Sequence, residues 1–152
     1  MFQIIFMFSK SCEYGLRAII YIAKQTSLGN KTSVKEIAEA TDSPVAFTGK
    51  ILQKLTKNNV VQSIKGPYGG FLIDEDKTKS TNLSEIVKVI DGNHIYTRCG
   101  LGLKECNANS PCPMHDKFIN IRSDLKSMLQ STSIYDLIKS NTGKSKAIQL
   151  KR

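Results

Sequence analysis

A turn rich in glycine and proline, Lys65-Gly-Pro-Tyr-Gly-Gly70, most limits the folds open to this 152-residue chain. It separates two β-rich runs, Val60–Ile64 and Phe71–Ile73. Gly and Pro at this density end regular structure, and two such runs around a turn predict a β-hairpin. The remaining periodic segments are helical, so we expect a mainly α protein that carries one two-stranded hairpin.

Three helical segments precede the hairpin. Leu16–Ala23 is apolar on nearly all sides, which is typical of a buried helix. Ser33 and Glu36 form a capping box that opens a short second helix. Ser43 followed by Pro44 opens a third helix, with the serine as N-cap. Helix, short helix, capped helix and hairpin in this order predict a winged helix-turn-helix, with the hairpin as the wing.

A winged helix-turn-helix suggests double-stranded DNA as the partner. The chain has 22 Lys and Arg against 13 Asp and Glu, an excess that favours nucleic acid over a membrane. The helix from Pro44 would enter the major groove, with Thr48 and Lys50 at base edges and Lys54 at phosphate. Lys65 at the wing tip suits the minor groove. The candidate DNA-binding residues are Ser43, Thr48, Lys50, Lys54, Lys65, Gly66 and Tyr68.

Each of these features also has a plainer interpretation. The helix from Pro44 could be a core helix with a solvated basic face, and the wing an ordinary hairpin loop. Gly49 costs about 1 kcal/mol against Ala inside a helix. A close approach of its backbone to DNA would explain it, and so would a tolerated defect.

Three of the four cysteines lie in one loop, at residues 93–113. They are Cys99, Cys106 and Cys112, and His115 follows. No apolar run is long enough to span a membrane, so a cytoplasmic location without a membrane partner is expected. Thiols stay reduced there, and clustered thiols are metal or cluster ligands before they are disulfides. Cys112-Pro113 opens a helix, and its dipole would make Cys112 the most easily ionised thiol.

Residues after the hairpin carry two further helical patterns. Asn82 and Glu85 form a second capping box, before a helix that reaches Ile90. Beyond the loop, a stripe of apolar residues recurs at three- and four-residue intervals: Phe118, Ile121, Leu125 and Met128. A last short helix, 134–138, follows Ser133. We therefore expect a DNA-binding domain at 8–80, the cysteine loop and dimerisation helices at 81–140, and a disordered basic tail at 141–152.

Three motifs resemble the Rrf2 family of bacterial transcription regulators. The wing 65–72, the start of the first helix at Tyr14-Gly-Leu-Arg17 and the segment Ile51-Leu-Gln-Lys-Leu55 are similar to the family's own, and the likeness runs from Phe8 to Ser140. It implies a homodimeric winged-helix repressor or activator on a palindromic operator, with residues 113–130 as the dimerisation helix. Lys65 and Tyr68 replace the family's usual Arg and Gly, so the minor-groove contact would be weaker or differently shaped. The family begins near Met7, which leaves residues 1–6 as an extra apolar arm or as a segment before the true start.

The resemblance also implies an iron–sulfur cluster, held by Cys99, Cys106 and Cys112, that controls DNA binding. His115 matches members that hold a two-iron cluster, and Glu13 matches an acidic ligand that reaches across from the partner chain. Cys12 is a third candidate without family precedent. We favour 2Fe-2S over 4Fe-4S, although the first cysteine interval is one residue longer than usual. Such a cluster is often lost in air, so its absence from an aerobically prepared sample would not contradict this expectation.

Other functions remain open from the sequence. Cys3His is an ordinary structural zinc set, and an empty loop of reactive thiols is also consistent with the spacing. From another class, the chain could be a small electron carrier or a metal-binding enzyme. The presence of only two His, without a His/Asp/Ser constellation, speaks against an enzyme. A basic wing has no use in an electron carrier.

Overall fold

The protein is mainly helical, with one small sheet. The computed structural model describes residues 7–104, 107–139 and 149–151. The expectations for residues 1–6 and for most of the tail 141–152 therefore lie outside the described residues. In chain order the elements are α1 (Lys10–Ser27), α2 (Val34–Thr41), α3 (Val45–Lys57), β1 (Gln62–Ile64), β2 (Gly70–Leu72), α4 (Glu75–Ser80), α5 (Leu83–Asp91), α6 (His94–Thr97), α7 (His115–Ser131) and α8 (Ile134–Lys139).

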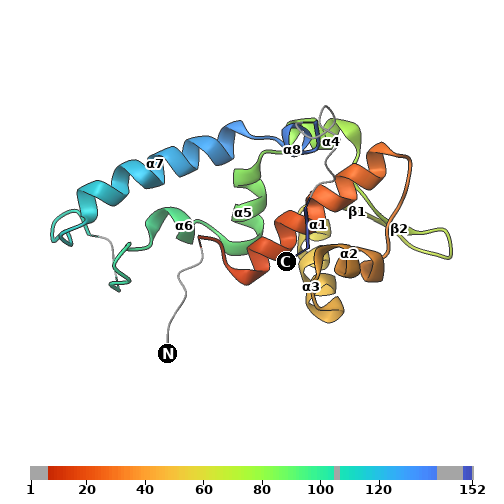
Figure 1. Cartoon of the computed structure of the whole chain (residues 1–152), viewed down its shortest axis with the longest axis horizontal. Coiled ribbons are helices and arrows are strands. Elements are labelled where there is room, and N and C mark those ends of the chain that lie inside the picture. The colour runs from red at the N-terminus through yellow and green to blue at the C-terminus, as the bar shows by residue number, and fades with distance from the viewer. Residues whose placement is uncertain (1–6, 105–106, 140–148, 152) are drawn as a thin grey trace.

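Helices α1–α3 and the hairpin form the predicted winged helix-turn-helix (Figure 1). β1 and β2 pair antiparallel, with Ser63 opposite Phe71. The capping box of α2 is confirmed, because the Ser33 amide donates to the Glu36 carboxylate at 2.6 Å and the Glu36 amide donates back to the Ser33 hydroxyl at 3.3 Å. α3 differs from the prediction at its start: Pro44 occupies the N-cap position, and Ser43 is not the cap.

Helices α5 and α8 complete the core of the winged-helix unit. Ile86 on α5 and Ile134 on α8 are fully buried, in one cluster with Ile19 and Ile22 of α1. The predicted short helix after Ser133 is confirmed, and the Asp136 amide donates to the Ser133 hydroxyl at 3.1 Å. Described residues beyond 80 therefore do not build a separate core.

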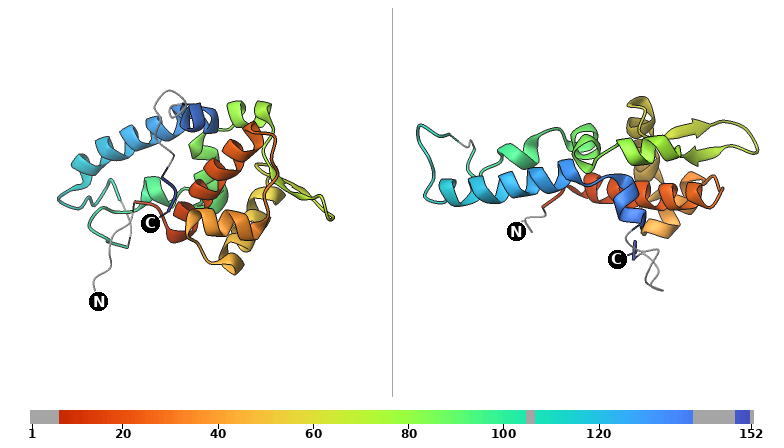
Figure 2. Two further views of the ribbon diagram at one scale, coloured as in Figure 1. Left: turned by 45° about the vertical axis from the view of Figure 1, so that its right-hand side comes forward. Right: turned by 90° about the horizontal axis from the view of Figure 1, so that it is seen from above.

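Helix α7 leaves this core as an arm, with α6 and the cysteine loop alongside it (Figures 1 and 2). Leu129, near the end of the helix, is its one buried residue within the described chain. Two helices were not predicted. α4 follows the hairpin, and the helical turn α6 lies inside the stretch 93–113 that we expected to be all loop. Both are shorter than two turns, too short for periodicity to reveal.

Helix α1 extends well beyond its apolar run, from Lys10 to Ser27. Its N-cap is Ser9, whose hydroxyl accepts from the Cys12 amide at 3.0 Å. The glycine of the Tyr14-Gly-Leu-Arg17 motif lies against α5. A Cβ added to Gly15 would lie 2.3 Å from Ile90 Cδ1, so the absence of a side chain permits this close packing of the two helices.

Candidate nucleic-acid interface and cysteine site

The exposed face of α3 carries Lys50 and Gln53, as expected for a helix that enters the major groove. Thr48 does not belong to this face, and its predicted position at base edges is wrong. Its exposed fraction is 2%, and its hydroxyl lies 2.9 Å from the Pro44 carbonyl oxygen, to which it donates. Helical periodicity could have predicted the burial of Thr48, because Thr48 lies between Phe47 and the buried Ile51 and Leu52 on the apolar side of the helix.

A short chain of hydroxyls fixes the turn between α2 and α3. The Ser43 hydroxyl oxygen lies 2.9 Å from that of Thr41 and 2.7 Å from that of Thr48. Thr41 in turn donates to the Ile37 carbonyl at 2.7 Å. Ser43 and Thr48, which we expected at DNA, therefore hold α3 in its orientation against α2.

Lys54 also differs from its predicted role. Its Nζ donates to the carbonyl of Ile90, at the end of α5, at 3.1 Å. The ammonium group is thus directed at another helix of the same chain. Periodicity along α3 cannot reveal a partner that lies 36 residues away.

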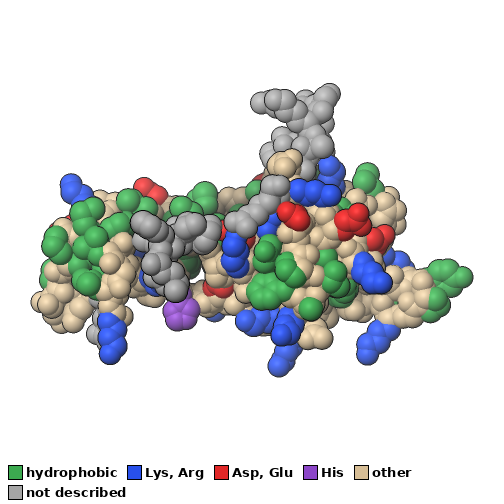
Figure 3. Space-filling model, turned by 60° about the horizontal axis from the view of Figure 1, so that its bottom comes forward, with side chains coloured by type: hydrophobic (Ala, Val, Ile, Leu, Met, Phe, Trp, Pro, Cys, Tyr) green, Lys and Arg blue, Asp and Glu red, His purple; other side chains and the backbone are tan. Residues whose placement is uncertain are grey.

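The wing tip is exposed as predicted. Lys65 and Gly66 are exposed, and Tyr68 has an exposed fraction of 88%. Gly66 has a φ of +105°, a conformation that side chains disfavour, and its carbonyl accepts from the Gly69 amide at 3.0 Å. Figure 3 shows Lys and Arg side chains that project along the lower edge of the molecule. The unit therefore presents cations on a helix and on a narrow tip, an arrangement suited to phosphate and groove contacts.

The cysteine loop brings two of its thiols together. Cys99 follows α6, Cys112 precedes α7, and their Sγ atoms lie 3.7 Å apart. Both are free thiols. Cys106 lies outside the described residues, and within them no three His, Cys, Asp or Glu side chains converge on one point. The third expected ligand is thus the one left undescribed.

Backbone amides stabilise the ionised form of Cys99. Hydrogen bonds from Leu101 and then Leu103 lower the pKa of this thiol, and Cys112 and the Arg122 charge add to the effect. The predicted start of a helix at Cys112-Pro113 is wrong, because α7 begins only at His115. The backbone amides that donate to the Cys99 sulfur belong to a loop, whose conformation helical periodicity cannot predict.

Helix α7 supports the loop from the other side. Arg122 Nη1 donates to the Arg98 carbonyl at 2.8 Å. The Phe118 ring lies against Gly100, where an added Cβ would come within 2.1 Å of the ring. The base of the loop is therefore held by α7 on one side and by its own turn on the other.

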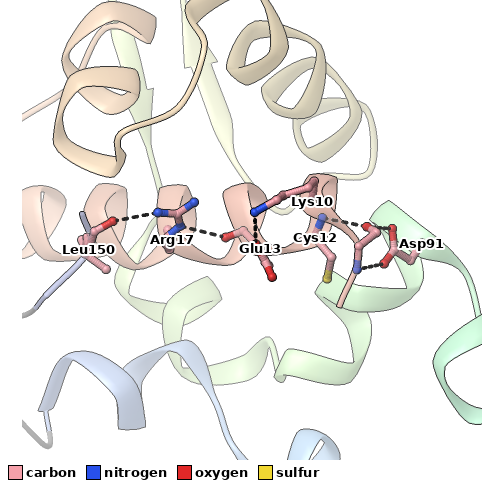
Figure 4. A network of polar contacts seen from close by, with 7 residues as sticks. Lys10, Cys12, Glu13, Arg17, Asp91 and Leu150 are labelled. Carbon is pink, nitrogen blue, oxygen red and sulfur yellow. Dashed lines mark hydrogen bonds and ion pairs between the residues drawn. The ribbon is translucent and has the colours of Figure 1, made fainter. Parts of the chain in front are cut away.

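The three candidates for a fourth ligand are not equally placed. His115 is the first residue of α7, and its amide donates to the Cys112 carbonyl at 3.0 Å. Glu13 lies on α1 and pairs with Lys10 at 3.3 Å (Figure 4). Cys12 is fully buried in the core; burial, followed by the charges of Asp91 and Glu13, raises its pKa to about 12. Cys12 is therefore a neutral thiol in the core, where it is not accessible as a ligand for a metal or cluster.

The predicted stripe of α7 has an exposed edge. Ile121 and Met128 have exposed fractions of 57% and 49%, whereas Phe118 and Leu125 are half-buried. Met114, also exposed, was missed although it extends the same spacing. The residues 114, 118, 121, 125 and 128 alternate four- and three-residue steps, which is the spacing of helices that pair along a heptad seam.

The end of the predicted tail lies against α1. The Leu150 carbonyl accepts from Arg17 Nη1 at 3.2 Å, and the Arg17 guanidinium also lies over the Tyr14 ring, 5.0 Å from its centroid (Figure 4). Residues 149–151 are thus placed, while the rest of the disorder prediction concerns residues outside the described chain. No helix in the described ranges combines the length and the apolar character that crossing a bilayer requires.

Comparisons with known proteins agree on one family. The model of Rrf2, described as an iron-dependent transcriptional regulator, matches residues 8–140. An HTH-type transcriptional regulator of Aquifex aeolicus is 32% identical over 87% of this chain and 91% of its own length. The HTH-type transcriptional regulator IscR of Xenorhabdus nematophila is 25% identical over 83% of this chain and 75% of its own.

Solved structures show the same fold. The global cysteine regulator CymR of B. subtilis superposes with a TM-score of 0.70, at 25% identity over 93% of this chain and 99% of that one. T. potens IscR also gives a TM-score of 0.70, at 19% identity over 93% of this chain and 92% of that one.

Proposed function

This chain belongs to the Rrf2 family of transcriptional regulators, and from that premise we propose that an iron–sulfur cluster on the cysteine loop controls its affinity for DNA. Like its relatives, the protein is a DNA-binding regulator and not an enzyme. A regulator of this kind acts where the DNA lies, so we place it in the cytoplasm.

One observation carries the proposal: the 3.7 Å between the Cys99 and Cys112 sulfurs. A tetrahedral metal with metal–sulfur bonds of about 2.3 Å holds two ligand sulfurs about 3.8 Å apart. The hydrogen bonds that lower the pKa of Cys99 favour the thiolate form, which is the form that binds metal. The residues present therefore fit such a group without a change in this separation.

The cluster would be held by Cys99, Cys106 and Cys112. His115 is our first candidate for the fourth ligand, since it begins α7 directly after the Cys112 turn. Glu13 of a partner protomer is the second. Thiolate with imidazole favours a two-iron cluster. Oxidation or loss of the cluster would supply the chemical signal.

The DNA-binding form would be a homodimer that represses from a palindromic operator. Two α7 helices would pair along the heptad-spaced face that contains Ile121 and Met128. Their pairing would set the two α3 helices about 34–36 Å apart, one turn of DNA. Lys50 and Lys65 would then contact the major and minor grooves.

Zinc is the second candidate for the loop. The sulfur separation fits a zinc ion as well, and Cys3His is a common zinc ligand set. In that case the loop would be a fixed structural support, and its occupancy would carry no signal.

Anaerobic purification tests the proposal. We expect a brown protein whose Mössbauer spectrum is that of a cluster, and whose DNA affinity changes when the cluster is removed. Cys112→Ala should lose the colour, whereas the matched control Cys12→Ala should keep it, since Cys12 is a core residue. A colourless protein with stoichiometric zinc would refute the cluster.

A further inference from the structure

The C-terminal end of α5 is the point where the cysteine loop, α1 and α3 meet. We propose that Ile90, Asp91 and Gly92, which we call the α5 joint, couple the cysteine loop to the DNA-binding helix. In this proposal Lys54 is a positioning residue and not a phosphate contact. The inference rests on the proposed function, in which events at the loop alter DNA binding.

The link from the joint to α3 is a hydrogen bond. Lys54 Nζ donates to the Ile90 carbonyl at 3.1 Å. The last carbonyls of a helix have no partner within the helix, and a cation there also interacts favourably with the helix dipole. The hydrogen bond and the helix dipole therefore both stabilise the Lys54 ammonium at this end of α5. A movement of the Ile90 carbonyl would move Lys54 with it.

The links from the joint to α1 are polar and steric. The Ser9 amide donates to an Asp91 carboxylate oxygen at 3.3 Å, and the Ser9 hydroxyl donates to the other oxygen (Figure 4). The Ile90 side chain fills the space left by Gly15, where an added Cβ would lie 2.3 Å from its Cδ1. Asp91 and Ile90 thus hold the start of α1 on either side of the last turn of α5.

The loop begins at the joint itself. Gly92 has a φ of +71°, which redirects the chain out of α5, and α6 starts two residues later. Tyr96 of α6 donates to the Ser84 hydroxyl at 3.4 Å, and Cys99 follows at the end of this short segment. A displacement of Cys99 that moves α6 is therefore transmitted to α5 along the chain through Gly92 and Asp91, and through the Tyr96 hydrogen bond to Ser84.

Because coupling is reciprocal, the joint can be tested without a cluster: if the loop affects DNA binding, DNA binding must affect the loop. The probe is a duplex selected from a random-sequence pool by the wild-type protein. Amide hydrogen exchange of residues 91–99 is measured in the apo protein with and without this duplex. The variants are Lys54→Met, which keeps the length of the side chain, and Lys57→Met, which removes one charge from the same helix without touching α5.

We expect DNA to change exchange at residues 91–99 by about five-fold or more in the wild type and in Lys57→Met, and to leave it unchanged in Lys54→Met. The salt dependence of DNA binding should be the same for Lys54→Met as for the wild type. Asp91→Ala should weaken the coupling too, while the Ser9 cap on the Cys12 amide stays in place.

Three outcomes would overturn the joint. The first is a DNA-induced change in exchange in Lys54→Met that is as large as in the wild type. The second is the absence of any such change in the wild type. The third is a salt slope of DNA binding that falls by about 0.9 in Lys54→Met, as expected when one phosphate contact is lost. A colourless wild-type preparation that still shows the Lys54-dependent response would refute the cluster alone and leave the joint standing.

Discussion

Gly15→Ala tests how closely α1 and α5 pack. The new Cβ would lie 2.3 Å from Ile90 Cδ1 and 3.3 Å from Ile51 Cγ2, whereas carbon atoms in contact prefer about 3.5–4.0 Å. Overpacking of this kind costs about 1–3 kcal/mol. Replacing Gly by Ala inside a helix returns about 1 kcal/mol. The variant should therefore lose about 0–2 kcal/mol of unfolding free energy.

A second substitution separates the two effects. Ile90→Val removes the Cδ1 atom and leaves Cγ1 at an ordinary 3.6 Å from the new Cβ. In that background only the 3.3 Å contact with Ile51 Cγ2 stays tight, so Gly15→Ala should be stabilising by at most about 1 kcal/mol, the gain from helix propensity. The coupling between the two substitutions is then about 1–3 kcal/mol, well above the 0.3–0.5 kcal/mol scatter of independent sites.

Urea unfolding followed by circular dichroism measures all four proteins, at one protomer concentration because dimerisation would shift the transition. Gly49→Ala is the matched control, since a Cβ at Gly49 meets its nearest atom, Val34 Cγ1, only at 3.9 Å. It should stabilise the protein. A coupling below about 0.5 kcal/mol, or a Gly15→Ala variant as stable as Gly49→Ala, would refute the close packing.

Three further predictions concern the DNA-binding unit and the core. Thr48→Val should cost about 1–3 kcal/mol of stability by breaking the hydroxyl chain, and leave operator preference unchanged; an altered base preference in a binding selection would contradict its buried role. Lys65→Ala should reduce the salt slope of DNA binding by about 0.9 if it contacts a phosphate, and an unchanged slope would argue against the wing contact. Burial raises the pKa of Cys12 to about 12, whereas an unfolded thiol ionises near its ordinary pKa of 9.0. Stability is therefore intact below pH 9 and falls by about 1.4 kcal/mol per pH unit between pH 9 and pH 12. Cys12→Ala should remove that part of the alkaline loss, as pH-dependent urea unfolding would show.

Much of the fold could be predicted from local patterns. The capping box at Ser33 and Glu36 and the turn around Gly66 involve residues within a few positions of each other. Their hydrogen bonds and backbone angles need no distant partner. The order of these elements was then sufficient to predict a winged helix, and the spacing of Cys99, Cys106 and Cys112 predicts a ligand loop, in which Cys99 and Cys112 lie close together.

The roles of individual side chains depended on contacts between distant parts of the chain. The position of Lys54 in the helical pattern is that of a surface lysine. Only the packing of α3 beside α5 brings the Ile90 carbonyl to its ammonium group. From the sequence, Cys12 was a candidate for the fourth ligand. Only its burial in the folded chain makes it a neutral core residue. Short-range patterns specify helices, turns and ligand types because their energetics are local. Burial, charge and hydrogen-bond partners are set by the assembled core, and so the tertiary structure alone decided which of these residues are exposed, paired with another helix or buried in the interior.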